Sequence, residues 1–290
     1  MKKNLSVSFS GGRTSAYMAK WLIDNKSKEY DLTFIFANTG QEHEKTLEFV
    51  DKCDKEFGLN LVWIETVVNS EKGKGSTYKI VDYESASRNG EPFEEVCSVY
   101  GLSNPDFQPC NREMKTVPMN KYRRDHFGKD CEIAIGIRVD EIDRMNPSAK
   151  DQKIIYPLIS WHPTTKAEVR NWWANQSFDL EIPEHMGNCV TCWKKSNRKL
   201  WTIAKHEPHR FDFFKRMEKE HGFSGEPSKN GQPRRWFRGY QSVDDIIATS
   251  RGSFKEFKDY MPELQYRLDL DDQSNGCEES CDAFSATSDE

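Results

Sequence analysis

The chain has 290 residues, of which 36% are hydrophobic and 31% are charged, and its net charge is −5. This length is sufficient for a complete α/β core and a second, smaller unit. The net charge excludes a uniformly basic polyanion-binding protein. The sequence has no run of eighteen or more apolar residues, so a membrane span is not expected.

The start of the chain passes from Met1-Lys2-Lys3 directly into an apolar segment, without the hydrophobic stretch of a signal peptide. We therefore expect a cytoplasmic protein with no membrane partner. In a reducing compartment disulfides are rare, so the eight cysteines point to metal binding or catalysis.

Residues 5–23 predict a strand, a Ser/Gly loop and a helix, in that order. The loop reads Ser10-Gly11-Gly12-Arg13-Thr14-Ser15. Its glycines permit a tight turn with exposed N–H groups, and the start of a helix favours anions. We predict a phosphate cradle that differs from the Gly-x4-Gly-Lys-Ser/Thr loop of ATPases, in which the second glycine and the lysine lie elsewhere. An ordinary strand-to-helix turn is the alternative.

The next elements repeat this order. Residues 32–37 form an apolar run typical of a buried parallel strand, which ends in Asn38-Thr39-Gly40-Gln41-Glu42. An amphipathic helix follows up to Phe57, and a third strand is predicted at 59–64. The alternation predicts an α/β fold with a doubly wound parallel sheet, in which ligands bind beyond the carboxyl ends of the strands.

Residues 69–127 are interpreted as an insertion outside this sheet, either a lid over the site or a long surface connection. The insertion contains Cys110 in a proline-bounded loop and ends in a basic helix from Lys115 to Arg124. The sheet resumes with a strand at 131–136, followed by Gly136-Ile137-Arg138-Val139-Asp140-Glu141-Ile142-Asp143-Arg144.

Three ordered motifs resemble the phosphoadenosine-phosphosulfate (PAPS) reductase family of the adenine-nucleotide α-hydrolase (PP-loop) superfamily. They are Ser-Gly-Gly-x-x-Ser, Asn-Thr-Gly-x-Glu followed by Thr-Leu-Glu-Phe, and Gly-Ile-Arg-x-Asp-Glu-x-x-Arg, within residues 4–160. The resemblance implies a Rossmann-like fold that binds ATP or a PAPS-like adenine nucleotide. The nucleotide-binding residues expected on this basis are Ser10, Gly11, Gly12, Arg13, Thr14, Ser15, Asn38, Thr39, Gly40, Glu42, Gly136, Arg138 and Arg144.

One position departs from the family pattern. Many PP-loop enzymes have Asp immediately before the last Ser of the loop, where this chain has Thr14. Asp140, Glu141 and Glu42 remain as candidates to hold magnesium, although each acid taken alone is more often a solvated surface residue. Arg138 and Asp140 are the expected catalytic residues of this half of the chain.

The cysteines form a second feature. Cys189-Val190-Thr191-Cys192 follows a glycine-containing loop, Cys110 lies upstream, and Cys277 and Cys281 lie in the tail. Four thiolates suit an iron–sulfur cluster or a structural zinc. Because related enzymes hold a cluster around Cys-x-x-Cys, the resemblance favours iron–sulfur, with Cys110, Cys189, Cys192 and Cys281 as ligands. Cys53 and Cys131 are expected as small core residues, and Cys97 is left undecided.

One tail cysteine completes the expected metal site, and the other is free to act as a nucleophile. Cys277 and Cys281 are therefore both candidate catalytic thiols. Reductases of the family carry this cysteine in a Glu-Cys-Gly-x-His-like motif, whereas this chain has Gly276-Cys277-Glu278-Glu279-Ser280-Cys281. Carboxylates beside a thiol raise its pKa and weaken it as a nucleophile. The missing motif counts against simple sulfonucleotide reduction without excluding it.

Charge is unevenly distributed along the chain. Residues 269–290 hold eight acidic residues and no Lys or Arg, so the remainder carries about +3. Basic residues alternate with aromatic ones between 193 and 238, which suits either a nucleic-acid partner or an amphipathic helix at 196–222 with core aromatics and solvated charges. The second interpretation is favoured.

The predicted organisation has three parts. Residues 1–160 form the nucleotide-binding domain, 161–268 a mostly helical, cysteine-bearing region, and 269–290 an acidic tail that is expected to be disordered after Asp282. Three functions remain open: adenylylation with sulfur transfer to an acceptor, such as a nucleic acid; sulfonucleotide reduction with thioredoxin; and nucleotide-dependent regulation with structural zinc.

Overall fold

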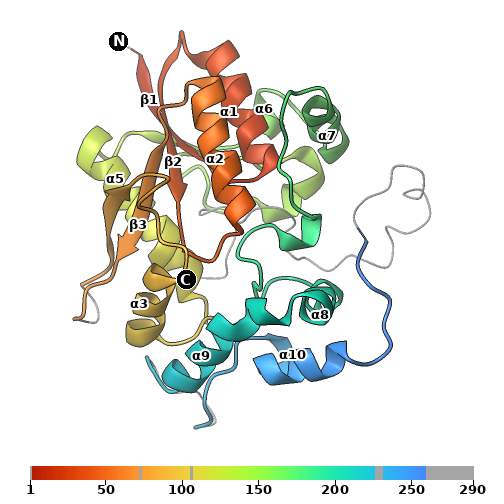
Figure 1. Ribbon diagram of the computed structural model, residues 1–290. Helices are drawn as coiled ribbons and strands as arrows, with labels where there is room; N and C mark the ends of the chain where they lie inside the picture. Colours follow the sequence, from red (N-terminus) through yellow and green to blue (C-terminus); the bar gives the residue numbers. More distant parts are fainter. Residues whose placement is uncertain (1, 72–73, 105–106, 226–230, 259–290) are drawn as a thin grey trace.

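The computed structural model describes residues 2–71, 74–104, 107–225 and 231–258 and shows an α/β protein (Figure 1). Within these residues six strands form one sheet in the order β4-β3-β2-β1-β5-β6. The strands are β1 (Lys3–Ser8), β2 (Tyr30–Ala37), β3 (Val62–Val67), β4 (Thr77–Val81), β5 (Glu132–Ala134) and β6 (Ile154–Ile155). The expected α/β, Rossmann-like fold class is confirmed.

The sheet is mostly parallel. The pairs β1–β2, β2–β3, β1–β5 and β5–β6 are parallel, with Val7 of β1 between Phe34 and Ala134. At one edge, β4 pairs antiparallel with β3. The prediction that residues 69–127 lie outside the sheet was therefore wrong at β4. The short connection after β3 allows a hairpin-like return, whereas a further parallel strand would need a long crossover.

Helices connect the strands and build a further layer. The longer ones are α1 (Arg13–Lys26), α2 (Glu44–Phe57), α3 (Glu91–Tyr100), α5 (Val117–Phe127), α7 (Lys166–Ala174), α8 (Asn197–His206), α9 (Asp212–His221) and α10 (Val243–Ser250). Short helical segments are α4 (Pro109–Asn111), α6 (Pro157–Ser160), the π-helical η1 (Arg112–Thr116), and the 3-10 segments η2 (Val139–Arg144), η3 (Glu184–Met186), η4 (Pro208–Phe211) and η5 (Arg238–Tyr240).

Alternate residues of β2 belong to two separate hydrophobic cores. Phe34 and Phe36 belong to the large apolar cluster that includes α1 and α2, whereas Ile35 and Ala37 belong to the smaller cluster that includes Met119 of α5. Side chains of a strand alternate between the two faces of the sheet. Because both faces are covered, β2 is apolar at successive positions, as its sequence indicated.

The start of the third strand was displaced from its predicted position. The third strand begins at Val62 rather than residue 59, because the chain first turns through Gly58 and Asn60, which have φ of 64° and 51°. The Leu61 N–H donates to Asp54 Oδ1 over 2.9 Å in this turn. Leu59 and Leu61 are nevertheless buried, so their apolar character reports burial and not strand structure.

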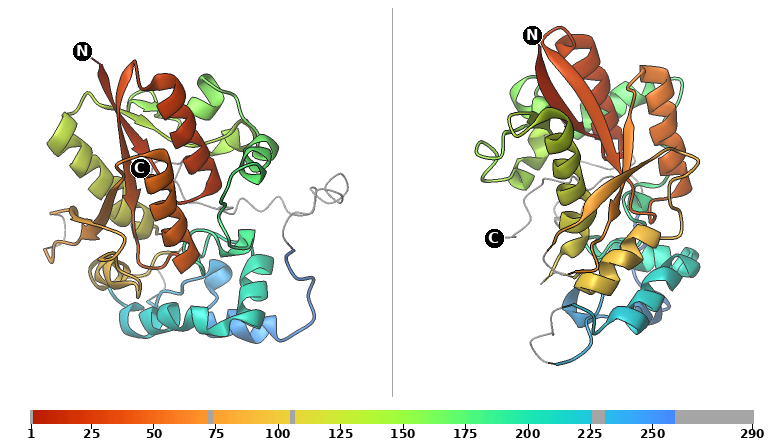
Figure 2. Two further views of the ribbon diagram at one scale, coloured as in Figure 1. Left: turned by 45° about the horizontal axis from the view of Figure 1, so that its top comes forward. Right: turned by 90° about the vertical axis from the view of Figure 1, so that its left-hand side faces the viewer.

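The carboxyl ends of the parallel strands point toward a layer formed by α8, α9 and α10 (Figures 1 and 2). The single helix predicted at 196–222 is divided into α8, η4 and α9, and Pro208 lies at the division. A proline removes a helix hydrogen bond and clashes with the preceding turn. Phe214 and Trp236 are buried and stack at 4.0 Å, which confirms that these aromatics belong to the core.

Candidate active site

The loop between β1 and α1 is closed by its own serines. Ser15 Oγ donates to the Gly12 carbonyl over 2.9 Å and accepts from the Ser10 N–H over 3.2 Å. Gly11 has φ of 82°, and a Cβ there would lie 3.0 Å from Thr46 Cγ2. Only glycine adopts this conformation without strain at such a close approach. The Ser15 hydroxyl therefore shapes the loop.

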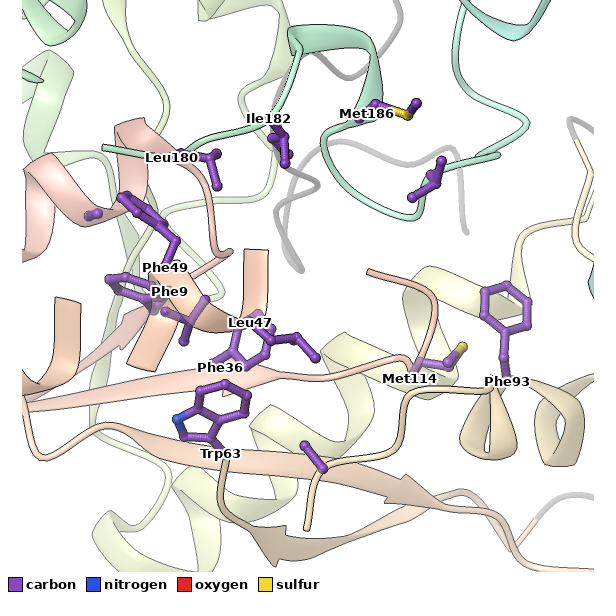
Figure 3. Close-up of a cluster of buried hydrophobic side chains, with 14 of the residues drawn as sticks. Phe9, Phe36, Leu47, Phe49, Trp63, Phe93, Met114, Leu180, Ile182 and Met186 are labelled. Atoms are coloured by element: carbon purple, nitrogen blue, oxygen red, sulfur yellow. The ribbon is translucent and has the colours of Figure 1, made fainter. Parts of the chain in front are cut away.

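The donors of this loop are available to an anion. Helix α1 begins after Gly12 without a side-chain cap and without an acidic residue in its first turn. Its first N–H groups have no partner within the helix, and they carry the positive end of the helix dipole. Ser10 Oγ is buried and has no hydrogen-bond partner among the described residues. Phe9, Phe36 and Leu47 form part of the core that supports the loop (Figure 3).

Arg13 has a different position from the one its place in the loop suggested. Its guanidinium binds both carboxylate oxygens of Asp179, at 2.6 and 3.0 Å, and donates to the Leu180 carbonyl at 2.5 Å. Bidentate arginine–carboxylate pairs fix geometry strongly. Arg13 thus ties the segment before the Cys-x-x-Cys to the start of α1.

The segment after β5 reaches the same loop. Arg138 is buried and donates to Thr14 Oγ1 over 2.8 Å, and it pairs with Asp140 at 3.1 Å and Glu141 at 3.3 Å. Arg144 also pairs with Glu141. The structure therefore brings together the predicted residues of the first and third motifs. Thr14, which replaces the family's Asp, accepts a hydrogen bond from Arg138 where a carboxylate would form an ion pair.

The loop after β2 is held by a buried carboxylate that the sequence analysis missed. Glu65 of β3 is fully buried and accepts from Asn38 Nδ2 at 2.7 Å and from the Ser87 N–H at 2.5 Å. Asn38 Oδ1 in turn accepts from the Gly40 N–H at 3.2 Å. The sequence offered one signal for this role, since Glu65 is a charged residue within an otherwise apolar strand. A carboxylate buried in this way requires hydrogen-bond or ion-pair partners.

The insertion packs against this loop. Asn38 Nδ2 also donates to the Ser87 carbonyl over 2.9 Å, and a Cβ on Gly40 would lie 2.9 Å from the Gly90 nitrogen. A Cβ on Gly90 would lie 2.4 Å from Phe213 of α9. The three segments are therefore in close contact, and both glycines have positive φ. The part of the insertion near Ser87 covers the loop after β2.

Three of the four predicted metal-binding cysteines line one cavity. Cys110, Cys189 and Cys192 surround a volume of about 30 Å³, together with apolar side chains, Thr39, two asparagines and two lysines, Lys115 and Lys194. Thr39 Oγ1 lies 3.4 Å from Cys189 Sγ and donates to Glu42 at 2.7 Å. The Val190 N–H donates to the Gln41 carbonyl over 3.1 Å. The loop after β2 thus lies at the same edge of the sheet as the 10–15 loop, and it also borders the cysteine cavity.

The donor set fits a thiolate-bound metal group. Two further side chains lining this cavity, Asn188 and Trp193, have buried polar atoms with no hydrogen-bond partner among the described residues. A volume of 30 Å³ admits only about two water-sized groups. The cavity is therefore smaller than a cluster of several metal ions.

The three cavity sulfurs do not form a compact group in the protein without metal. Among the described residues, the three-residue group of acid, His or Cys ligand atoms within 4.8 Å of one another is Glu94, Glu220 and His221. Tetrahedral zinc with sulfur at about 2.3 Å needs sulfurs roughly 3.8 Å apart. The three described thiols are therefore not preformed for zinc.

The remaining cysteines differ in their surroundings. Cys53, Cys97 and Cys131 are buried, and burial raises the pKa of each thiol above its usual value. Cys53 and Cys131 are core residues, as expected. Burial, with a contribution from Glu42, also raises the pKa of the Cys189 thiol in the absence of metal. Cys277 and Cys281 lie outside the described residues.

A separate hollow of about 640 Å³ opens beside the carboxyl end of β3. Its lining includes Lys74 and two residues of α5, Lys121 and Arg124. The helical run 109–127 thus lines the cysteine cavity near its start and this basic hollow farther along. None of the described helices is both long and apolar enough to cross a bilayer.

Comparison with known proteins agrees with the three motifs. A family model described as the phosphoadenosine phosphosulfate reductase domain matches residues 4–176. An uncharacterized nin region protein of Escherichia phage lambda is 32% identical over 288 residues, covering 96% of this chain and 94% of the phage protein. An uncharacterized protein of Methanocaldococcus jannaschii is 25% identical over 233 residues, covering 76% of this chain and 48% of that protein. The similarity to the phage protein extends past the family domain into the C-terminal helices.

Proposed function

Since the chain belongs to the phosphoadenosine phosphosulfate reductase domain family, we propose that it is an enzyme that binds ATP or a related adenine nucleotide and transfers sulfur to an acceptor after adenylylation. The proposed phosphate site is the 10–15 loop with the N-terminus of α1. Its support is the uncapped helix start and the unpartnered Ser10 hydroxyl.

One observation carries the proposal of sulfur chemistry. The loop after β2 lies at the nucleotide edge of the sheet, and its Thr39 hydroxyl is 3.4 Å from Cys189 Sγ. Ligands of doubly wound sheets bind along this edge. Phosphate chemistry and thiol chemistry therefore have neighbouring sites, which a transfer between two substrates requires.

In the proposed reaction an oxygen of the acceptor attacks the α-phosphorus of ATP, and the bond to the bridging oxygen of pyrophosphate breaks. The loop N–H groups and Arg138 stabilise the charge that develops on the phosphate. Asp140, Glu141 and Glu42 are the candidates to hold magnesium. A hydrosulfide sulfur then attacks the acceptor carbon, the carbon–oxygen bond breaks, and AMP leaves with the former acceptor oxygen.

We propose that Cys110, Cys189, Cys192 and the tail residue Cys281 hold an iron–sulfur cluster. When bound, the cluster would supply a binding position for inorganic sulfur or for an electron. The apolar lining keeps water away from reactive sulfur. A structural zinc held by the same thiols, in a nucleotide-binding regulator, is the alternative.

The acceptor is proposed to be a nucleic acid whose phosphates bind in the basic hollow of Lys74, Lys121 and Arg124. Lys74 and Lys121 pair with Glu71 and Asp125 at the surface, so phosphates would compete with these carboxylates. Exposed ion pairs of this kind contribute little stability and exchange readily. A sulfur donor or thioredoxin is the proposed protein partner.

The second candidate is sulfonucleotide reduction, which the description of the matching family favours. Here the thiolate of Cys277 or Cys281 attacks the sulfur of PAPS or adenylyl sulfate, and the sulfur–oxygen bond to the nucleotide phosphate breaks. A thioredoxin dithiol then releases sulfite and leaves the cysteine reduced. Cysteine-to-serine changes at both tail positions would abolish sulfite release.

The deciding experiment begins with anaerobic purification and measurement of iron, sulfide and the visible spectrum. Pyrophosphate release from ATP is then measured with and without a nucleic-acid acceptor, and sulfite release is measured from PAPS. Acceptor-stimulated pyrophosphate release by iron-containing protein supports the main proposal. Sulfite release without ATP turnover supports reduction, and nucleotide binding by a zinc protein without turnover supports the regulator.

A further inference from the structure

Asn188 has an unusual combination of properties for a side chain next to a metal-binding cysteine. It is only 5% exposed, and its φ is 60°. Both polar atoms of its amide are buried without a hydrogen-bond partner among the described residues. The side chain lines the same small cavity as Cys110, Cys189 and Cys192.

Each of these properties costs free energy in the protein without a bound group. A buried amide loses its hydrogen bonds to water, and nearly all such groups in folded proteins find replacements. Backbone in the left-handed region is unfavourable for residues with a Cβ, although asparagine tolerates it better than most. Such costs concentrate at positions whose geometry serves a ligand.

The position of Asn188 indicates which ligand. It precedes Cys189 directly and belongs to the lining of the cavity that Cys110, Cys189 and Cys192 also line. Amide N–H groups donate to sulfide and thiolate sulfur, whereas a carboxamide is a poor ligand for iron in a sulfur-rich site. Thr39, the hydroxyl nearest to Cys189, donates to Glu42 at 2.7 Å and 2.8 Å.

We propose that Asn188 is a positioning residue whose amide hydrogen-bonds the sulfur atoms of the group bound by Cys110, Cys189 and Cys192. This inference rests on the proposed iron–sulfur cluster and adds a residue that tunes it without ligating it. A donor to cluster sulfur stabilises the more negative, reduced state and raises the reduction potential. Trp193 lines the same cavity, and its buried indole N–H, which has no partner among the described residues, is a second donor of this kind.

The test uses the full-length protein, reconstituted anaerobically with iron and sulfide, and measures iron content and reduction potential. Asn188→Gly keeps the positive φ and removes the amide. Asn188→Asp keeps the shape but presents an anionic acceptor to the sulfurs. Asn60→Gly is the matched control, because Asn60 also has positive φ, at 51°, and is exposed away from the cavity.

We expect all three variants and the wild type to bind equal iron. The potential should become more negative in Asn188→Gly, more negative still in Asn188→Asp, and remain unchanged in Asn60→Gly. If Asn188→Asp loses iron, the inference is tested by the reduction potential of Asn188→Gly alone. Equal potentials in loaded wild type and Asn188→Gly would overturn the inference and leave the cluster intact, whereas a wild type without iron uptake would overturn the proposed cluster together with the inference.

Discussion

The phosphate loop and the cysteine cavity are built in different ways, although they lie at the same edge of the sheet. The loop is one continuous segment, residues 10–15, closed by hydrogen bonds of its own serines. The cavity combines residues from the loop after β2, helices α3 and α4, the 187–193 loop and Trp236. A local site is complete once its segment folds, whereas an assembled site depends on all the contacts that bring its segments together.

The two regions also differ in what they leave unsatisfied. The loop presents N–H groups and one hydroxyl, which suit an anion from solution. The cavity leaves an amide and an indole N–H buried beside three sulfurs. We therefore expect the nucleotide to bind to a preformed loop, and the metal group to complete a site that is strained without it. Four changes test this difference.

The largest effect is expected for Cys189→Ser, which removes one of the three thiols that line the cavity. Iron bound after anaerobic reconstitution should fall almost to zero, because serine is a poor ligand for a cluster. Nucleotide affinity, measured by calorimetry, should stay the same, since the phosphate loop is independent. Cys53→Ala is the control and should retain iron, because Cys53 is a core residue. Full iron content in Cys189→Ser would contradict the proposed ligand set.

Gly11→Asp should damage the other region alone. Left-handed backbone costs about 1–2 kcal/mol for a residue with a Cβ, and the carboxylate repels phosphate. The nucleotide dissociation constant should rise by about 100-fold, or roughly 2.8 kcal/mol, with unchanged iron content.

Gly128→Asp controls for the backbone strain and the added charge. Gly128 has φ of 76°, a Cβ added to it would meet no atom within 4 Å beyond its chain neighbours, and it lies at the end of α5. This variant should bind nucleotide normally. Equal losses of affinity in both glycine variants would show that the Gly11 effect is not specific to the loop.

Glu65→Gln should affect both regions together, because Glu65 holds the loop after β2 that borders each of them. The glutamine oxygen can keep the bonds from Asn38 and the Ser87 N–H, which both go to Oε1, but its NH2 would replace Oε2, which accepts from the Ser87 hydroxyl and pairs with Lys79 at 3.0 Å. Chemical denaturation should show a loss of about 2–3 kcal/mol in unfolding free energy, with lower nucleotide affinity and lower iron content.

The control for this change is Glu44→Gln, at a partly exposed carboxylate 3.0 Å from Arg88. Exposed ion pairs contribute at most about 1 kcal/mol, so its stability should change little. A Glu65→Gln protein that loses iron but keeps full nucleotide affinity would show that the two regions do not share this support.

The smallest effect is expected in the segment after α10. Its Phe257 ring packs against the His185 ring, with 5.6 Å between the ring centroids. Hydrogen bonds from Lys205 and His206 lower the pKa of Glu256 to about 2 from its usual 4.5. The ionised carboxylate is therefore favoured in the folded protein, and its contribution is present above pH 4.5 and is lost as the pH falls toward 2.

Hydrogen exchange at the Phe257 N–H, which donates to Thr202 Oγ1, should report this change. The protection factor, which is the intrinsic exchange rate divided by the observed rate, should fall below pH 4.5 in the wild type and should already be low at about pH 7 in Glu256→Gln. Residues 10–15 should exchange equally in both proteins. Unchanged protection of Phe257 in the variant would show that Glu256 does not hold the segment.

Sequence reasoning worked well where a pattern was local. The Ser10–Ser15 loop, the helix from Glu44 to Phe57 and the apolar run of β2 all lie where they were predicted. The strand at 77–81 was missed, because its exposed edge position leaves little apolar periodicity. The third strand was placed three residues early, because buried turn residues gave the same apolar signal as a strand.

The prediction of the candidate site shows the same difference between local patterns and long-range contacts. Sequence spacing identified the three cysteines of the cavity and the motif residues Arg138 and Thr14, which the structure brings together. It assigned the Arg13 side chain to phosphate because its partner, Asp179, lies 166 positions away in the chain. It passed over Glu65 and Asn188, because nothing in their neighbours shows that one carboxylate is fully buried or that one amide lacks a partner.

The sequence by itself determined the family, the Ser/Gly loop at 10–15 and the supply of thiols, since these depend on a few residues at fixed short spacing. Only the tertiary structure decided that Cys189 lies beside the loop after β2, that the Arg13 side chain pairs with Asp179, and that an amide without a partner among the described residues lines the cysteine cavity. The physical reason is that short-range backbone geometry is a property of adjacent residues. Burial and hydrogen-bond partnership depend on distant segments that meet only when the chain has folded.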